Sequence, residues 1–274
     1  MPDRPLPNKI RFRFLQINYI DHSVIEFLNA NKHIWDRMGT KLELLFANVQ
    51  PIWDVFVHEI WPIFAANVRH LYFLNSAYLD NLRRHISPTI LTDLDHLNSI
   101  DSYALFPDGI AEDGPNATAG QALSKWLHTP SNDGQPKRLY RNGYVGSLNL
   151  EWVNSFKEAF RCATTSVSYT IQLYFCVETM PIEPFELLNE RTKEKLTLKQ
   201  NIEEDNLVNW LLQRCPIGET ATAPVKFELR YDYSGANLNK ILFNLWDGKR
   251  CIGPLSPPAE EEKEKADQSN KNVI

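Results

Sequence analysis

The stretch from Leu71 to Leu79 constrains the fold more than any other part of this 274-residue chain. Its apolar or small residues fall at Leu71, Leu74, Ser76 and Leu79, an L-x-x-L-x-φ-x-x-L spacing in which φ is apolar or small. Similar spacings, the second one looser, occur at Phe12, Leu15, Ile17 and Ile20, at Leu42, Leu45 and Ala47, and at Leu97, Ile100, Ser102 and Leu105. We call each of these stretches a rung, and a segment with helix-like spacing lies between successive rungs.

The spacing between rungs predicts a repeat architecture. The rungs begin at residues 12, 42, 71 and 97, which gives steps of 30, 29 and 26 residues. Leucine-rich repeats combine a strand and a helix in about 20–29 residues. A unit of this size cannot bury its own apolar face, so it must stack on its neighbours. The N-terminal half is therefore predicted to be a leucine-rich-repeat-like β-α solenoid.

The helices between rungs have recognisable ends. Asp21 or Ser23 is expected to cap the first helix, and Gly39 to end it. A second helix is expected over 52–66, where Pro62 should kink or break it. A third is expected from residue 79 through 94.

The character of the chain changes beyond residue 105. Residues 106–120 predict a loop, followed by a helix at 121–128, a strand at 138–145 and a helix at 150–163. From residue 166 the pattern is β-rich, and we expect strands at 167–177, 185–188, 195–199, 209–215, 225–233 and 241–246. The sequence therefore predicts three regions. They are a repeat-like β-α region at 9–165, a β-rich cap or small domain at 166–253, with a cap favoured, and a disordered tail at 254–274.

Composition and motifs exclude several classes of function. A net charge of −5 argues against a nucleic-acid-binding protein. No signal peptide and no apolar run long enough for a membrane span is visible, so an intracellular protein, cytoplasmic or nuclear, is expected. His58-Glu59 is followed by Pro62 where a zinc-binding motif needs histidine, and no C-x-x-C unit is present. No metal, cofactor or catalytic motif is expected.

The strand face that points away from the predicted core is the candidate site. If Leu15, Ile17 and their counterparts point inward, the alternate residues point outward. The expected partner-binding residues are Gln16, Asn18, Phe46, Asn48, Asn75, Asp101 and Tyr103, with Ala77 among them on the same face. This amide-rich, mildly acidic strip with two aromatic residues suits a concave protein-binding surface. The alternative is an ordinary solvated sheet surface.

Another class of function remains open at the 106–120 loop. Asp108, Glu112 and Asp113 would have to converge in a pocket to serve a small hydrolase or transferase. A further alternative is a truncated paralogue without a present partner.

Five blocks of the sequence resemble a family of nematode F-box proteins. They are YIDHSVIEFL (19–28), LRRHISPTIL (82–91), GQALSKWLHTP (120–130), EPFELLNERT (183–192) and WLLQRCPI (210–217). The likeness runs in order over most of residues 5–220. Several blocks together make the resemblance fairly specific to that family.

The resemblance implies a substrate receptor of a ubiquitin ligase, without catalysis of its own. In such proteins an F-box docks on the Skp-type adaptor of a cullin ligase, and the region after it is expected to select protein substrates. Residues 1–9 are too few and too polar to form an F-box, so no adaptor-binding residue is carried over. A Skp-type adaptor is expected as a partner only if the full gene product contains that module.

Overall fold

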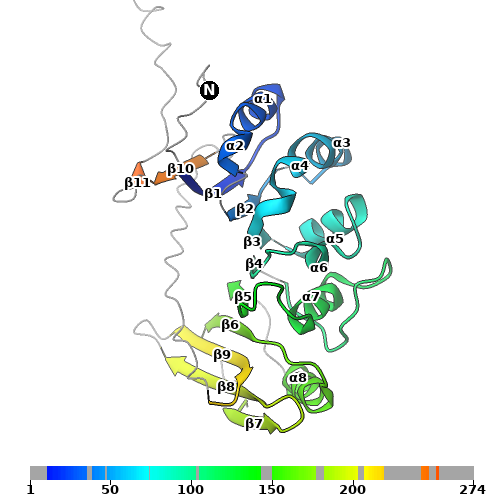
Figure 1. Cartoon of the computed structure of the whole chain (residues 1–274), viewed down its shortest axis with the longest axis vertical. Helices are drawn as coiled ribbons and strands as arrows, with labels where there is room; N and C mark the ends of the chain where they lie inside the picture. Colours follow the sequence, from blue (N-terminus) through cyan, green and yellow to red (C-terminus); the bar gives the residue numbers. More distant parts are fainter. Residues whose placement is uncertain are drawn as a thin grey trace, which may run out of the picture.

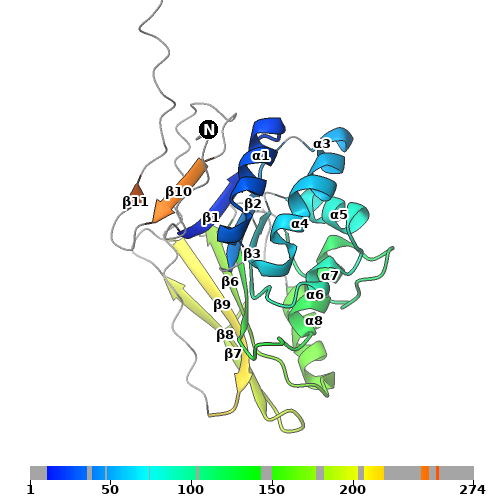
Figure 2. The same ribbon diagram turned by 45° about the horizontal axis from the view of Figure 1, so that its top comes forward.

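The computed structural model describes residues 11–35, 39–46, 48–73, 75–102, 105–142, 150–176, 182–202, 207–218, 242–246 and 251–252. These residues form a mixed α/β structure built on one open, 11-stranded sheet. The strands follow an arc, and the helices lie along its outer side (Figure 1). A view tilted by 45° again shows the helices gathered on one side of the strands (Figure 2).

The centre of the sheet consists of parallel strands in chain order. They are β1 (Arg11–Ile17), β2 (Thr40–Leu44), β3 (Val68–Phe73), β4 (Ser99–Ser102), β5 (Lys137–Asn142) and β6 (Tyr169–Cys176). After each strand, a connection that contains helix or loop brings the chain back to the end of the sheet at which the next strand begins, as parallel pairing requires.

A row of aliphatic side chains crosses these strands at one register level. Leu15, Leu42, Leu71, Ile100, Leu139 and Ile171 are paired in turn across the six strands. All six are buried in the hydrophobic core, under the helices. This row accounts for the recurrence of apolar residues in the rungs of the sequence.

The helices fill the connections on one face. They are α1 (His22–Ala30), α2 (Lys32–Trp35), α3 (Gln50–Val55), α4 (Trp61–Phe64), α5 (Ser76–His85), α6 (Ile90–Asp93), α7 (Ala119–His128) and α8 (Leu150–Cys162). Of the two expected caps, Asp21 is the one that caps α1, accepting from the Val24 amide at 2.9 Å. The break expected near Pro62 is present as a π-helical turn, Phe56–Ile60, because proline cannot donate the regular helical hydrogen bond. A short 3₁₀ turn, Ala65–Asn67, then leads into β3.

The β-rich region continues the same sheet. β6 pairs in parallel with β5, and β9 (Leu207–Pro216), β8 (Glu194–Ile202) and β7 (Phe185–Asn189) then add to it in antiparallel fashion. At the opposite edge, β10 (Leu242–Trp246) pairs antiparallel with β1, and β11 (Cys251–Ile252) pairs with β10. The strand expected at 225–233 and the tail expected at 254–274 lie outside the described residues.

Two rungs differ from the expected pattern. The second was expected to point Leu45 and Ala47 inward, but Leu42 and Leu44 occupy the core. The third was expected to remain extended to Leu79, but β3 ends at Phe73 and Ser76 begins α5. The Asn75 side chain accepts from the Ala77 amide at 3.0 Å and so caps that helix.

Candidate functional site

The face of the sheet that bears no described helix carries polar and charged side chains, and we call it the open face. Its members alternate along the strands with the buried core residues, so they point to the opposite side. The open face comprises Gln16, Lys41, Glu43, His70, Tyr72, Ser99, Asp101, Arg138, Tyr140, Thr170 and Gln172. Its central side chains are mostly inaccessible, because large neighbours on an inwardly curved sheet crowd one another.

Two titratable side chains, one from each of the two preceding strands, contact Asp101. Lys41 Nζ lies 3.1 Å from Asp101 Oδ2, and His70 Nε2 lies 3.0 Å from the same oxygen. The Asp101 side chain is only 1% exposed. Burial raises its pKa, but the hydrogen bonds and charges of His70 and Lys41 outweigh this, so the pKa lies below the ordinary value. Burial, opposed by Asp101, lowers the pKa of His70, which favours the neutral imidazole.

Glu43 lies on the same face, two residues after Lys41. It is 8% exposed. Burial first, and the nearby Asp101 charge to a lesser degree, raise the pKa of Glu43 to about 7 against the partial compensation of Lys41. A carboxyl group with this pKa changes its charge near neutral pH.

Four of the predicted binding residues have local structural contacts. Gln16 donates from Nε2 to Asn18 Oδ1 at 2.8 Å. Asn48 is exposed, and its Oδ1 accepts from Trp53 Nε1 at 2.7 Å and from Asn81 Nδ2 at 2.5 Å. Asn18, Asn48 and the helix-capping Asn75 follow successive parallel strands, so they mark one edge of the sheet rather than its open face.

The two predicted aromatic residues differ in outcome. The expected exposure of Phe46 is wrong: its side chain is 1% exposed and packs against Trp53 and Phe56, with ring centroids 5.1 and 5.2 Å away. The chain after β2 turns Phe46 toward the helices, where Tyr78 Oη donates to its carbonyl oxygen at 2.8 Å. Tyr103 lies outside the described residues.

The acidic loop does not gather its carboxylates into one cluster. Asp108 is exposed, and its Oδ2 accepts from Thr118 Oγ1 at 2.6 Å. Asp113 accepts from Thr92 Oγ1 at 2.9 Å, whereas Glu112 is exposed and bonds through its backbone amide to Gln121. These contacts fix the loop against the starts of α6 and α7, and no convergent acid pair results.

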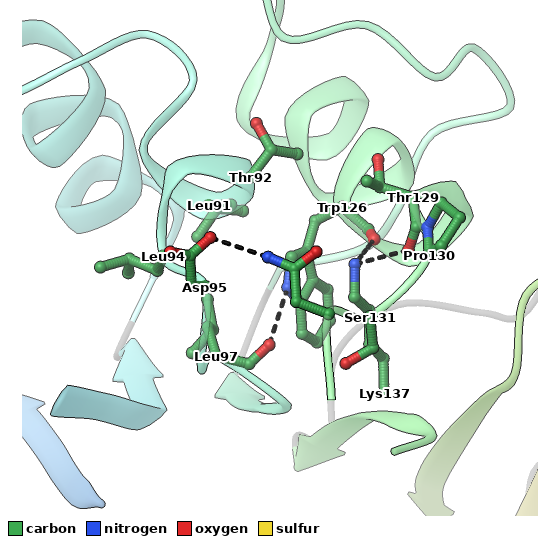
Figure 3. Close-up of a pocket in the computed structure, with 11 residues that line it drawn as sticks. Leu91, Thr92, Leu94, Asp95, Leu97, Trp126, Thr129, Pro130, Ser131 and Lys137 are labelled. Carbon is green, nitrogen blue, oxygen red and sulfur yellow. Dashed lines mark hydrogen bonds between the residues drawn. The ribbon is translucent and has the colours of Figure 1, made fainter. Parts of the chain in front are cut away.

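A small pocket lies where the chain enters β4 and β5 (Figure 3). It contains about 320 Å³ of empty space, including its open mouth, and lies between α6, the end of α7 and the 129–132 loop. Lys137 Nζ points into its wall and donates to the Thr129 carbonyl at 2.7 Å and to the Trp126 carbonyl at 2.5 Å. Asn132, another lining residue, donates from Nδ2 to Asp95 Oδ1 at 2.8 Å. Burial lowers the pKa of Lys137 to about 8. These mutual contacts already satisfy the polar groups, so the pocket offers little to a ligand.

A second buried ion pair joins two strands in the antiparallel part of the sheet. Arg214 on β9 donates to Glu194 Oε2 on β8 from Nη2 at 2.6 Å and from Nε at 3.1 Å. Glu194 Oε1 accepts from the Val167 amide at 2.8 Å and from Ser166 Oγ at 3.0 Å. Because every contact is internal, this pair ties β8 and β9 to the segment before β6 and has a structural role.

The described ranges contain no group of three or more metal-ligating side chains arranged to hold an ion. In the same part of the chain, no helix has the length and apolar character that crossing a membrane requires. No family model, curated protein or solved structure matches the chain. The geometry of the open face therefore carries the functional argument.

The sequence patterns did not predict three of the four titratable side chains that gather around Asp101 on the open face. Asp101 was expected on the binding face, but Lys41, Glu43 and His70 were not. The simple alternation of Leu42, Leu44 and Phe46 would have placed Lys41 and Glu43 together on the opposite side. His70 required the register between β3 and β4, which no local pattern gives.

Proposed function

We propose that this chain is a non-catalytic protein-recognition module that binds its partner through the open face. The observation that carries the proposal is the one-sided cover of the sheet. All described helices lie on the face of the aliphatic row, while the opposite face bears Lys41, Glu43, His70, Asp101 and Arg138. A curved surface with mixed charges and tyrosines suits a protein partner.

The architecture supports a leucine-rich-repeat-like solenoid in the N-terminal half. Its strand-and-helix units repeat in parallel, and one aliphatic residue per strand occupies the same register level. Repeat proteins of this kind present an extended concave surface to their partners. The antiparallel strands β7–β9 would then serve as the cap that ends the stack.

The resemblance to nematode F-box proteins supports a protein as the partner. It implies that the open face selects a protein that is then presented to a cullin ubiquitin ligase, or that the chain competes for that protein. Mixed charge and a net charge of −5 favour a protein over nucleic acid. Contact with a Skp-type adaptor is proposed only for a gene product that includes an F-box.

The test compares three forms of the tagged full chain in native lysate, read by quantitative mass spectrometry. The open-face variant carries Gln16→Ala and Arg138→Ala, two positions on that face that are partly accessible. The matched control carries Glu59→Ala and Lys125→Ala on the exposed outer side of the helices. We expect proteins that the wild type and the control recover equally and that the open-face variant recovers several-fold less.

Two outcomes contradict the proposal. One is equal recovery of every protein by all three forms, and the other is loss of recovery only in the helix-side control. Circular dichroism of each form verifies that differences in recovery do not arise from unfolding. Phe46→Ala is unsuitable here, because Phe46 belongs to the core.

A further inference from the structure

The open face is most accessible at its end on β7, β8 and β9. At the centre of that face, Tyr72 and Asp101 are only 3% and 1% exposed. On β8, by contrast, Lys199 is exposed and Lys195 is half-buried, and Leu188 on β7 is 57% exposed. These strands form one end of the arc in Figure 1, and β7 is the last strand of the sheet. A partner can therefore contact the open face most closely at this end.

The alternation along β8 places two lysines on the open face. Leu196 and Leu198 of this strand belong to the hydrophobic core. Lys195 and Lys199 alternate with them and point to the opposite side. Four residues of extended strand separate the α-carbons of the two lysines by roughly 13 Å. Lys195 is paired in the sheet register with Leu188, so an exposed apolar side chain lies beside this cation.

Both lysines are available to an acidic partner. Within the described residues, neither ammonium group takes part in an ion pair or a side-chain hydrogen bond. Glu186 lies on the same face and is paired with Thr197, the residue midway between the lysines. Arg138 on β5 adds a third cation, so the described open face from β5 to β7 carries three cations and one carboxylate. This part of the surface is positive, although the chain has a net charge of −5.

The charges on the other half of the open face are arranged differently. Lys41 and Asp101 lie 3.1 Å apart and compensate each other. Exposed cations without such a counter-ion attract a partner of opposite charge and disfavour one of the same charge. Carboxylates four residues apart on one side of an extended segment have the spacing of Lys195 and Lys199. Charge and spacing together favour an acidic, extended segment at this end of the face.

We propose that Lys195 and Lys199 bind an acidic segment of the partner protein, which lies extended over β8 and has two carboxylates four residues apart. This inference rests on the proposed function, because it names the chemistry of the partner that the open face recognises. Each ammonium group donates to one carboxylate, and Leu188 offers an apolar contact beside the first. Ion pairs at exposed positions are screened by salt, so the binding weakens as the ionic strength rises.

The direct test is an NMR titration of the labelled full chain at low salt. The probe is the blocked peptide acetyl-Glu-Thr-Thr-Thr-Glu-amide, in which the glutamates are four residues apart. One control peptide has glutamine at both positions, and a second has its two glutamates adjacent, on opposite sides of an extended chain. We expect binding on the order of millimolar with the largest shifts at residues 195–199, and several-fold weaker binding of both controls.

Two double variants locate the site. Lys195→Gln with Lys199→Gln should weaken binding of the acidic peptide several-fold. Lys32→Gln with Lys125→Gln removes the same charge from exposed positions on the helices and should leave binding unchanged. Because both double variants change the net charge equally, a difference between them assigns the binding to β8. Backbone spectra of both variants verify that the fold is retained.

A nucleic-acid strand tests whether the lysines attract any anion. Trithymidylate without terminal phosphates has the same net charge as the acidic peptide. Binding of this strand at Lys195 and Lys199 that equals or exceeds binding of the peptide would overturn the inference in favour of a nucleic-acid partner. The inference also fails if the glutamine peptide binds equally well, if the lysine variant retains full binding, or if the wild type binds no acidic peptide.

Failure of this inference is distinguishable from failure of the proposed function. A partner protein that depends on Gln16 and Arg138, with no acidic-peptide binding, would leave the recognition proposal standing and remove this one. Acidic-peptide binding at Lys195 and Lys199 without any such partner would do the reverse.

Discussion

Lys41 on β2 reaches across β3 and places its ammonium nitrogen 3.1 Å from Asp101 Oδ2 on β4. His70 on the intervening strand contacts the same oxygen at 3.0 Å. Asp101 thus links three neighbouring strands on the face that lacks described helical cover. The lysine side chain is 20% exposed, whereas that of Asp101 is nearly inaccessible, so the pair is screened from solvent mainly on the carboxylate side.

Asp101→Asn should destabilise the protein by about 2–3 kcal/mol, less than a fully buried pair because Lys41 keeps some contact with water. The lowered pKa of Asp101 means that its ionised form stabilises the fold above the ordinary value of 3.8 and that this contribution is lost as the pH falls through the folded-state pKa. Urea unfolding of both proteins should show that the variant is less stable throughout the range from pH 5 to 8. A deficit that vanishes at pH 8 would contradict the ion-pair interpretation.

Glu43→Gln should have the opposite dependence on pH. The pKa of Glu43 is raised from 4.5 to about 7, so folding favours its protonated form, and wild-type stability falls as the pH rises from 4.5 through 7. We expect the variant to match the wild type near pH 4.5 and to exceed it by on the order of 2 kcal/mol at pH 8, from about 1.4 kcal/mol per pKa unit with a discount for partial solvation.

The measurement is the free energy of unfolding at a series of pH values, and Glu59→Gln is the exposed control. The groups near Glu43 on this face are Gln16 on β1, Lys41 on β2, His70 and Tyr72 on β3, and Asp101 on β4. A stability gain that does not grow between pH 5 and 8 would show that Glu43 is not the group responsible.

The Arg214–Glu194 pair permits a double-mutant cycle. Arg214→Met or Glu194→Leu alone leaves a buried charge without its partner and should cost about 3–5 kcal/mol. The double variant removes both charges and should be clearly more stable than the sum of the two single effects predicts. Denaturant unfolding of the four proteins gives the coupling energy. Additive effects would mean that the two side chains, 2.6 Å apart at their closest, do not act as a unit.

Phe46→Ala should lower the free energy of unfolding by about 3–5 kcal/mol, the usual cost of removing a buried aromatic ring. Phe46→Leu retains most of the apolar volume and should cost distinctly less. Tryptophan fluorescence during urea unfolding is a suitable measurement, because Trp53 lies against the Phe46 ring. A negligible effect of the alanine substitution would instead contradict the burial of Phe46.

Thr118→Ala should destabilise the protein by about 1 kcal/mol through loss of a helix cap. Thr118 Oγ1 accepts from the Gln121 amide at 3.1 Å, and Gln121 Oε1 accepts from the Thr118 amide at 2.8 Å, which forms a capping box. The same hydroxyl donates to Asp108. Thr118→Ser retains the hydroxyl and should be close to wild type in thermal unfolding. Equal losses in the two variants would exclude the hydroxyl as the cause.

Local chemistry predicted much of the fold. Asp21 as one of two candidate caps of α1, the disturbance at Pro62 and the strands β7 and β8 were each expected and are present, because capping, proline geometry and strand alternation act within a few residues. The mixed α/β class followed from the same signals. What the sequence could not supply was the pairing of strands far apart in the chain.

The second rung shows why the candidate site was harder to predict. An inward set of Leu45 and Ala47 is offset by one residue from the observed core residues Leu44 and Phe46, and a shift of one residue exchanges the two faces of a strand. That exchange removed Phe46 from the predicted surface and brought Lys41 and Glu43 to it. Asn75 is absent from the open face for another reason. It directly precedes Ser76, and asparagine at that position favours the start of a helix.

The pairing of β10 with β1 has a consequence for biosynthesis. Leu242–Trp246 covers one edge of Arg11–Ile17, although the ribosome makes these two strands at widely separated times. During synthesis the parallel strands β1 to β6 can associate in order, but the outer edge of β1 stays without this partner until residue 246 has emerged. An exposed strand edge recruits other chains. Nascent chains that stall before residue 242 should therefore be the form of this protein that most needs a chaperone.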